Sequence, residues 1–128
     1  MTLHPSEVNA GVVFKRTDLP QNVAFKACAS SVGDTQMATS LRSQGYQIST
    51  VEHMMSALSG LGIDNVTIEV DGEELPIMDG SAAPFVFLLQ SAGIVDQSAK
   101  KRFLRILKRV EVSEGDATAS LAPYEGFK

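Results

Sequence analysis

Residues 48–62 have the sequence ISTVEHMMSALSGLG, which predicts an amphipathic helix that ends at Gly62. Ser49 and Glu52 have the spacing of a capping box, in which the hydroxyl and the carboxylate each bond a free backbone N–H. At about 100° per residue, His53 points away from the centre of the apolar stripe. That stripe follows helical spacing and comprises Val51, Met54, Met55, Leu58 and Leu61.

The Glu52–His53 pair at this helix start has two interpretations. In the structural one, Glu52 completes the capping box and His53 lies half-exposed beside it, which is the commoner situation. In the functional one, the positive end of the helix disfavours protonation of His53 and keeps the imidazole in the form that binds metal. Glu52 would then take a proton from metal-bound water without binding the metal itself. The residues alone leave both interpretations open.

The composition indicates one acidic domain. The chain has 128 residues, 44% of them hydrophobic, which is enough for a buried core. A net charge of −4 argues against a nucleic-acid-binding surface. The single cysteine, Cys28, excludes an internal disulfide and is expected to be a small buried hydrophobe. One basic cluster is expected on the solvated side of a strand; it comprises Lys100, Lys101, Arg102, Arg105, Lys108 and Arg109.

Apolar runs in the sequence are too short for a membrane span, which needs about 18 residues, and the first residues lack a signal-peptide pattern. We therefore expect a soluble, unexported protein without a stable membrane span, located in the cytoplasm.

Alternating and short apolar segments predict the strands, and a second helix is expected at 82–92, where Pro84 lies in the first turn and Gly93 ends the helix. Its apolar residues, Phe87 and Leu88 included, are expected to be buried. The order of elements predicts an α+β fold, with two helices packed on one face of a mainly antiparallel sheet. The expected strands are 11–16, 23–27, 35–41, 46–48, 65–70, 75–78, 103–112 and 117–122.

Two segments, TVEH at 50–53 with SALSGLGIDN at 56–65, and PIMDGSAAPFV at 76–86, closely resemble the UDP-3-O-acyl-N-acetylglucosamine deacetylase family, which makes lipid A of Gram-negative lipopolysaccharide. The similarity extends over essentially the whole chain, including RTDL at 16–19. Family members form a two-domain α/β sandwich. The resemblance implies that residues 1–128 are the first domain, truncated at both ends, and that the second domain is absent.

The resemblance also implies the chemistry: hydrolysis of the N-acetyl group of a UDP-linked acylated amino sugar. His53 would be one Zn²⁺ ligand and Glu52 the general base. The other zinc ligands and a further catalytic histidine belong to the second domain, partly in a His-Lys-x-x-Asp motif that this chain lacks, and His4 is not one of them. This chain alone is therefore expected to be inactive.

Residues that border the zinc cleft in the family, Thr35, Gln36 and Met37, are assigned to substrate contact. For Asp79, a role in the turn before the second helix is preferred to a role in binding substrate or supporting a ligand. The rival interpretation of the whole chain is a zinc-free binding or structural module that retains the domain without the chemistry.

Overall fold

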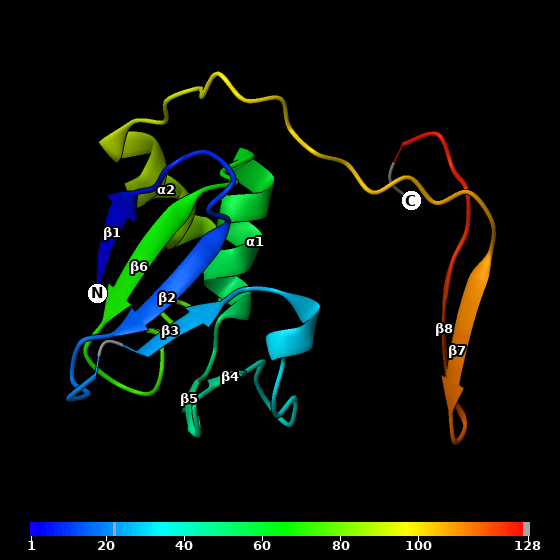
Figure 1. Ribbon diagram of the computed structural model, residues 1–128, viewed down its shortest axis with the longest axis horizontal. Helices are drawn as coiled ribbons and strands as arrows, with labels where there is room; N and C mark the ends of the chain where they lie inside the picture. Colours follow the sequence, from blue (N-terminus) through cyan, green and yellow to red (C-terminus); the bar gives the residue numbers. More distant parts are fainter. Residues whose placement is uncertain (22, 127–128) are drawn as a thin grey trace.

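A four-stranded sheet with two helices on one face forms the body of the molecule (Figure 1). The computed structural model describes residues 1–21 and 23–126. The elements, in chain order, are β1 (Thr2–Pro5), β2 (Val12–Arg16), β3 (Val23–Lys26), the short 3₁₀ helix η1 (Ala29–Ser31), β4 (Leu41–Ser43), β5 (Tyr46–Ile48), α1 (Glu52–Leu61), β6 (Val66–Val70), α2 (Ala83–Ala92), β7 (Val110–Glu114) and β8 (Ala117–Leu121).

The sheet has the strand order β1-β6-β2-β3, in which only the β2–β6 pair is parallel. Ile68 of β6 is aligned with Leu3 of β1 and with Phe14 of β2, and Phe14 is aligned in turn with Phe25 of β3. These four side chains therefore form an apolar row across the sheet, because aligned residues of neighbouring strands share a face. The expected α+β class is confirmed.

The core lies between this row and the helices. Met54 and Leu58 of α1 and Phe85 of α2 are each at most 2% exposed, as are Phe14 and Ile68. Each such side chain contributes about 1.5–3 kcal/mol relative to an exposed one. The apolar stripe predicted for α1 thus faces the sheet, and Gly62 ends the helix with φ +72°, a conformation that glycine adopts without strain.

Three of the expected strands differ from the structure. Residues 35–40 form a loop and only Leu41–Ser43 pairs with β5, because the loop bonds to its own backbone. Residues 75–78 form no strand, and pairing in this region is limited to the Ser49–Glu74 bridge. The strand expected at 103–112 begins only at Val110.

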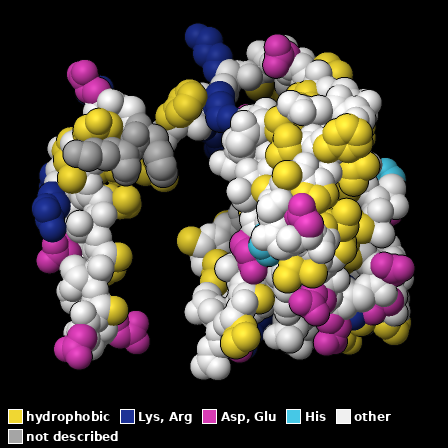
Figure 2. Space-filling view, turned by 180° about the vertical axis from the view of Figure 1, so that it is seen from behind, with side chains coloured by type: hydrophobic (Ala, Val, Ile, Leu, Met, Phe, Trp, Pro, Cys, Tyr) yellow, Lys and Arg dark blue, Asp and Glu magenta, His cyan; other side chains and the backbone are white. Residues whose placement is uncertain are grey.

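Several of the side chains expected to be buried are exposed instead, among them Cys28, Phe87, Leu88 and Ala92. Cys28 is exposed beside η1, where hydrogen bonds from Ser30 and Ser31 lower the pKa of its thiol. Phe87 and Leu88 are 69% and 54% exposed. Helix α2 is apolar on several sides, but within 1–21 and 23–126 only the side that carries Phe85 is covered. Figure 2 shows the resulting apolar area on the helical face.

Beyond α2, the chain leaves the body. The side chain of Gln97 still contacts the body. Its amide oxygen accepts a hydrogen bond from the Asn65 side chain at 2.7 Å, and its amide nitrogen donates to the backbone carbonyl of Ser6 at 2.8 Å. An extended segment then leads to the β7–β8 hairpin, which lies apart from the sheet and is exposed throughout (Figure 1). The basic cluster at 100–109 lies entirely in this irregular segment and is exposed, so its assignment to a strand was wrong. None of the described helices is both long and apolar enough to cross a bilayer.

Candidate functional site

Glu52 and His53 are the first two residues of α1, and the structure places both where the sequence predicts them. Each is half-buried. The carboxylate Oε2 of Glu52 accepts a hydrogen bond from the backbone N–H of Thr39 at 3.0 Å, which ties the helix start to the loop 33–40. The second oxygen, Oε1, has no hydrogen-bond partner among the residues that the structure describes. One oxygen thus orients the carboxylate and the other remains available for a proton.

The expected capping box is wrong. The N-cap position is Val51, and no side chain caps the helix there. Ser49 instead continues the extended chain, since its N–H bonds to the carbonyl of Glu73 at 2.8 Å and its carbonyl accepts from Leu75 at 3.1 Å. Glu52 is therefore released from capping, and its carboxylate reaches Thr39.

Asp79 lies in a tight turn that leads into α2. Its Oδ1 accepts hydrogen bonds from the N–H and the hydroxyl of Ser81, at 2.9 and 2.8 Å, and that hydroxyl accepts in turn from the N–H of Ala83. The hydrogen bonds from Ser81, its hydroxyl first, are the main reason why the pKa of Asp79 is lowered, and the coulombic effect of nearby His53 is a smaller cause in the same direction. The structure thus supports the turn role that the sequence favours, and it brings Asp79 within the electrostatic reach of His53.

The three residues assigned to substrate contact lie in the loop 33–40. Thr35, Gln36 and Met37 are exposed, and Met37 has φ +65° with a fully exposed side chain. The Gln36 N–H donates to Asp34 at 3.0 Å, which tightens the loop. Thr39, from the same loop, contacts Glu52, so the loop borders the start of α1. Contact with a substrate stays a prediction.

A catalytic zinc site needs three protein ligands and one open position. Within residues 1–21 and 23–126, no three His, Cys, Asp or Glu side chains lie close enough together to hold a metal ion. The other histidine, His4, lies on β1, and its Nε2 is 3.1 Å from Glu69 of β6. The described residues therefore do not by themselves fit a catalytic zinc ion, and His53 can offer one ligand position only.

The family model for UDP-3-O-acyl N-acetylglycosamine deacetylase matches residues 1–128. The chain belongs to this family. Three curated relatives, each named UDP-3-O-acyl-N-acetylglucosamine deacetylase, match all of the chain: those of Saccharophagus degradans (57% identical), Marinobacter nauticus (55%) and Stenotrophomonas maltophilia (58%). The chain spans 42% of the length of each relative.

Three residues around the site of this deacetylase family member were not identified from the sequence, namely Thr39, Thr50 and Glu74. Thr39 binds Glu52 through its backbone, which no side-chain pattern can reveal. Thr50 is 3% exposed and has φ +60°, and its hydroxyl donates to Glu74 at 2.7 Å. Thr50 lies within the stretch 48–62 that predicts the helix, and a left-handed conformation is not expected there because it is rare for a β-branched residue.

Proposed function

We propose that this chain forms the part of a UDP-3-O-acyl-N-acetylglucosamine deacetylase in which Glu52 is the general base and His53 is one ligand of a catalytic zinc ion. The remaining ligands would come from outside the described residues. The observation that carries the proposal is the Glu52–His53 turn itself, with one carboxylate oxygen oriented by Thr39 and the other without a hydrogen-bond partner in residues 1–21 and 23–126. It occurs in a chain that matches the family from end to end.

The proposed reaction is hydrolysis of the N-acetyl amide of the UDP-linked acylated amino sugar. A zinc ion bound in part by His53 would supply a water of lowered pKa, about 7, and would polarise the carbonyl. Glu52 would accept the proton that the attacking water loses, and transfer of a proton to the departing nitrogen would let the C–N bond break to give acetate and a free amine. The Thr39 N–H holds the Glu52 carboxylate in place during this step, which spares the cost of orienting it.

The loop 33–40 and the turn at Asp79 border the same helix end, so we assign Thr35, Gln36, Met37 and Asp79 to the neighbourhood of the substrate. Apolar surface is available beside them, since Ile77 is 57% exposed and Figure 2 shows apolar side chains gathered on the helical face. We propose that the rest of the enzyme, its second domain, covers this surface. The proposed place in lipid A biosynthesis implies reaction in the cytoplasm.

A chimera tests the proposal. Residues 1–128 replace the matching segment of the Saccharophagus degradans relative, and acetate release and zinc content are measured. We expect the chimera to be active, His53→Ala to lose zinc, and Glu52→Gln to keep zinc but lose about two to four orders of magnitude in turnover. Full turnover of Glu52→Gln would refute the base assignment. An inactive chimera that binds no zinc would favour the zinc-free binding module.

A further inference from the structure

We propose that Thr50 and Glu74 are positioning residues that fix the orientation of the Glu52–His53 turn. The inference rests on the proposed function, because it assigns the two residues to the same site. Neither residue reaches the reacting atoms in this assignment. They act through the backbone that leads into α1.

Thr50 has a conformation that its residue type disfavours. Its φ of +60° lies in the left-handed region, where a branched Cβ crowds the backbone, and glycine or asparagine would be accommodated more easily. The side chain is also buried, with 3% exposed. Such a residue persists only when its surroundings determine the conformation, and strained positions of this kind concentrate at functional sites.

The surroundings restrain Thr50 from both sides. Before it, Ser49 is bonded to the segment 73–75 through two backbone hydrogen bonds, at 2.8 and 3.1 Å. After it, the N–H of Val51 bonds to the carbonyl of Thr39 at 3.3 Å. The Thr50 hydroxyl adds a side-chain bond of its own, 2.7 Å to Glu74 Oε1. This bond joins the corner to a carboxylate, and charge-assisted bonds are the stronger kind.

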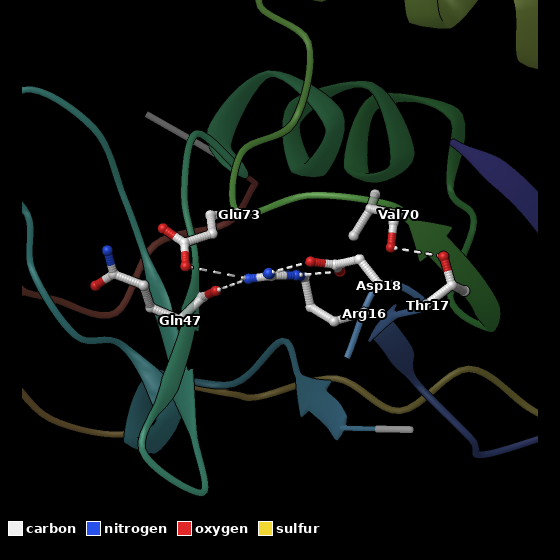
Figure 3. Close-up of polar contacts among 6 residues, drawn as sticks. All are labelled: Arg16, Thr17, Asp18, Gln47, Val70 and Glu73. Atoms are coloured by element: carbon white, nitrogen blue, oxygen red, sulfur yellow. Dashed lines mark hydrogen bonds and ion pairs between the residues drawn. The ribbon is translucent and has the colours of Figure 1, made fainter. Parts of the chain in front are cut away.

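Arg16 contacts the segment 73–75 through Glu73. Its guanidinium is 3% exposed and donates to the carbonyl of Gln47 at 3.0 Å, while Nη1 lies 3.8 Å from Glu73 (Figure 3). The other side of the guanidinium binds both oxygens of Asp18, at 2.7 and 2.5 Å. The ion pair with Glu73 links the segment that carries Glu74 to the end of β2, and Gln47 of β5 binds the same guanidinium.

The backbone conformation of Thr50 determines the position of Glu52, two residues later in the chain. The left-handed turn at Thr50 directs the chain so that the first turn of α1 meets the loop 33–40 and Glu52 binds Thr39. Without the hydroxyl bond, the restraint on the disfavoured φ is weaker and the turn can rotate. A displacement of about 1 Å in a catalytic group can reduce turnover about 100-fold.

Hydrogen exchange in this 128-residue chain tests the positioning directly. The variant Thr50→Val removes the hydroxyl at nearly constant shape, and Thr50→Ser keeps it. The measured quantity is the ratio of the exchange rate of the Thr39 amide to that of the Ile68 amide in the core. We expect Thr50→Val to raise this ratio about tenfold over the unsubstituted chain, and Thr50→Ser to change it by less than about threefold. A matched control is Thr67→Val, which removes the hydroxyl bond to Ser6 and should not change the ratio.

Two results in this experiment would overturn the inference. Equal acceleration at Thr39 and Ile68 would mean that Thr50 contributes general stability only. An unchanged Thr39 rate would mean that the hydroxyl does not restrain the turn. Glu74→Gln provides a second, independent variant, and it should shift the ratio in the same direction as Thr50→Val because a neutral amide accepts a weaker bond.

Kinetics of the chimera then test the link to catalysis. We expect Thr50→Val to lower kcat about 10- to 100-fold with KM changed less than about threefold, and Thr50→Ser to restore most of kcat. A fall in kcat that Thr50→Ser does not relieve would overturn the inference. Inactivity of the unsubstituted chimera would count against the proposed function instead, and the exchange ratio would still decide whether Thr50 positions the turn.

Discussion

Replacing Glu52 by alanine in this chain should lower the free energy of unfolding by about 1.5–2.5 kcal/mol. The carboxylate accepts a bond from the Thr39 amide at 3.0 Å, and bonds to charged groups contribute about 1.5–3 kcal/mol. Both residues are half-buried, which reduces this contribution to about 1–1.5 kcal/mol. A negative charge in the first turn of α1 adds about 0.3–1 kcal/mol through the helix dipole.

Glu52→Gln separates the two contributions, because glutamine keeps an oxygen that accepts the Thr39 bond but carries no charge. It should cost only about 0.5–1.5 kcal/mol. For a domain of this size, a change of 1 kcal/mol shifts Tm by about 3–5 °C, so we expect losses of about 5–10 °C for alanine and half of that for glutamine. Circular-dichroism melts and urea titrations at pH 7 measure both.

The control is Ser59→Ala, which removes an exposed hydroxyl from the same helix and should change stability by less than about 0.5 kcal/mol. If Glu52→Ala were no more destabilising than this control, the hydrogen bond from Thr39 would contribute nothing to the free energy of unfolding. The Glu52 carboxylate would then not be fixed by Thr39 when the protein is in solution. The argument that Thr39 orients the base would then fail. Equal losses for alanine and glutamine would assign the effect to charge alone.

Phe14→Ala should cost about 3–5 kcal/mol, since the ring is 0% exposed in the centre of the sheet; urea denaturation measures it, and a cost below about 1 kcal/mol would show that the core does not close around the ring. Arg16 lowers the pKa of Asp18 below its ordinary 3.8, so this carboxylate stabilises the fold above that pH, and the stabilisation is lost as pH falls through the lower folded pKa. Asp18→Asn should accordingly be less stable at pH 7 and lose less on acidification, and identical acid dependence of the two melts would contradict this. The 128-residue chain alone should release no acetate and bind zinc weakly, because the described residues offer one strong ligand; calorimetry showing nanomolar, stoichiometric zinc would disprove it. The chain should also self-associate as concentration rises, and deletion of 103–128 should reduce this, because every position of β7 and β8 is exposed; sedimentation of a strict monomer at high concentration would argue otherwise.

Elements with a strong local pattern could be predicted from the sequence. The strand 65–70 and the helix 48–62 alternate or repeat at the period of their structure, and Val66, Ile68 and Val70, which alternate along the strand, are at most 5% exposed. Glu52 and His53 were placed correctly for the same reason. Their position depends only on where the helix begins, which the apolar stripe defines to within a residue or two.

Features that depend on distant partners could not be predicted. Ser49 has the correct spacing for a cap, but its backbone pairs with the segment 73–75, and that pairing removes it from the helix end. Phe87 is apolar and lies in a helix, yet its exposure depends on what covers that side of α2. A capping box and an apolar sector are local signals, whereas pairing and coverage are decided by residues elsewhere in the chain.

The same distinction explains how the candidate site is built. Glu52 and His53 are adjacent in sequence, but the side-chain interactions that restrain their turn involve other segments: Thr39 of the preceding loop, Glu74 of the segment after β6, and Arg16 of β2, which pairs with Glu73. These partners belong to the body of this chain, so the orientation of the turn is established before any further ligand is added. A zinc ion bound to His53 would therefore lie beside a Glu52 carboxylate that is already oriented, and only its other ligands would have to be brought to the site. The conformational entropy of the Glu52–His53 turn is then lost when the chain folds and not when substrate binds, which is the physical basis of preorganised catalysis.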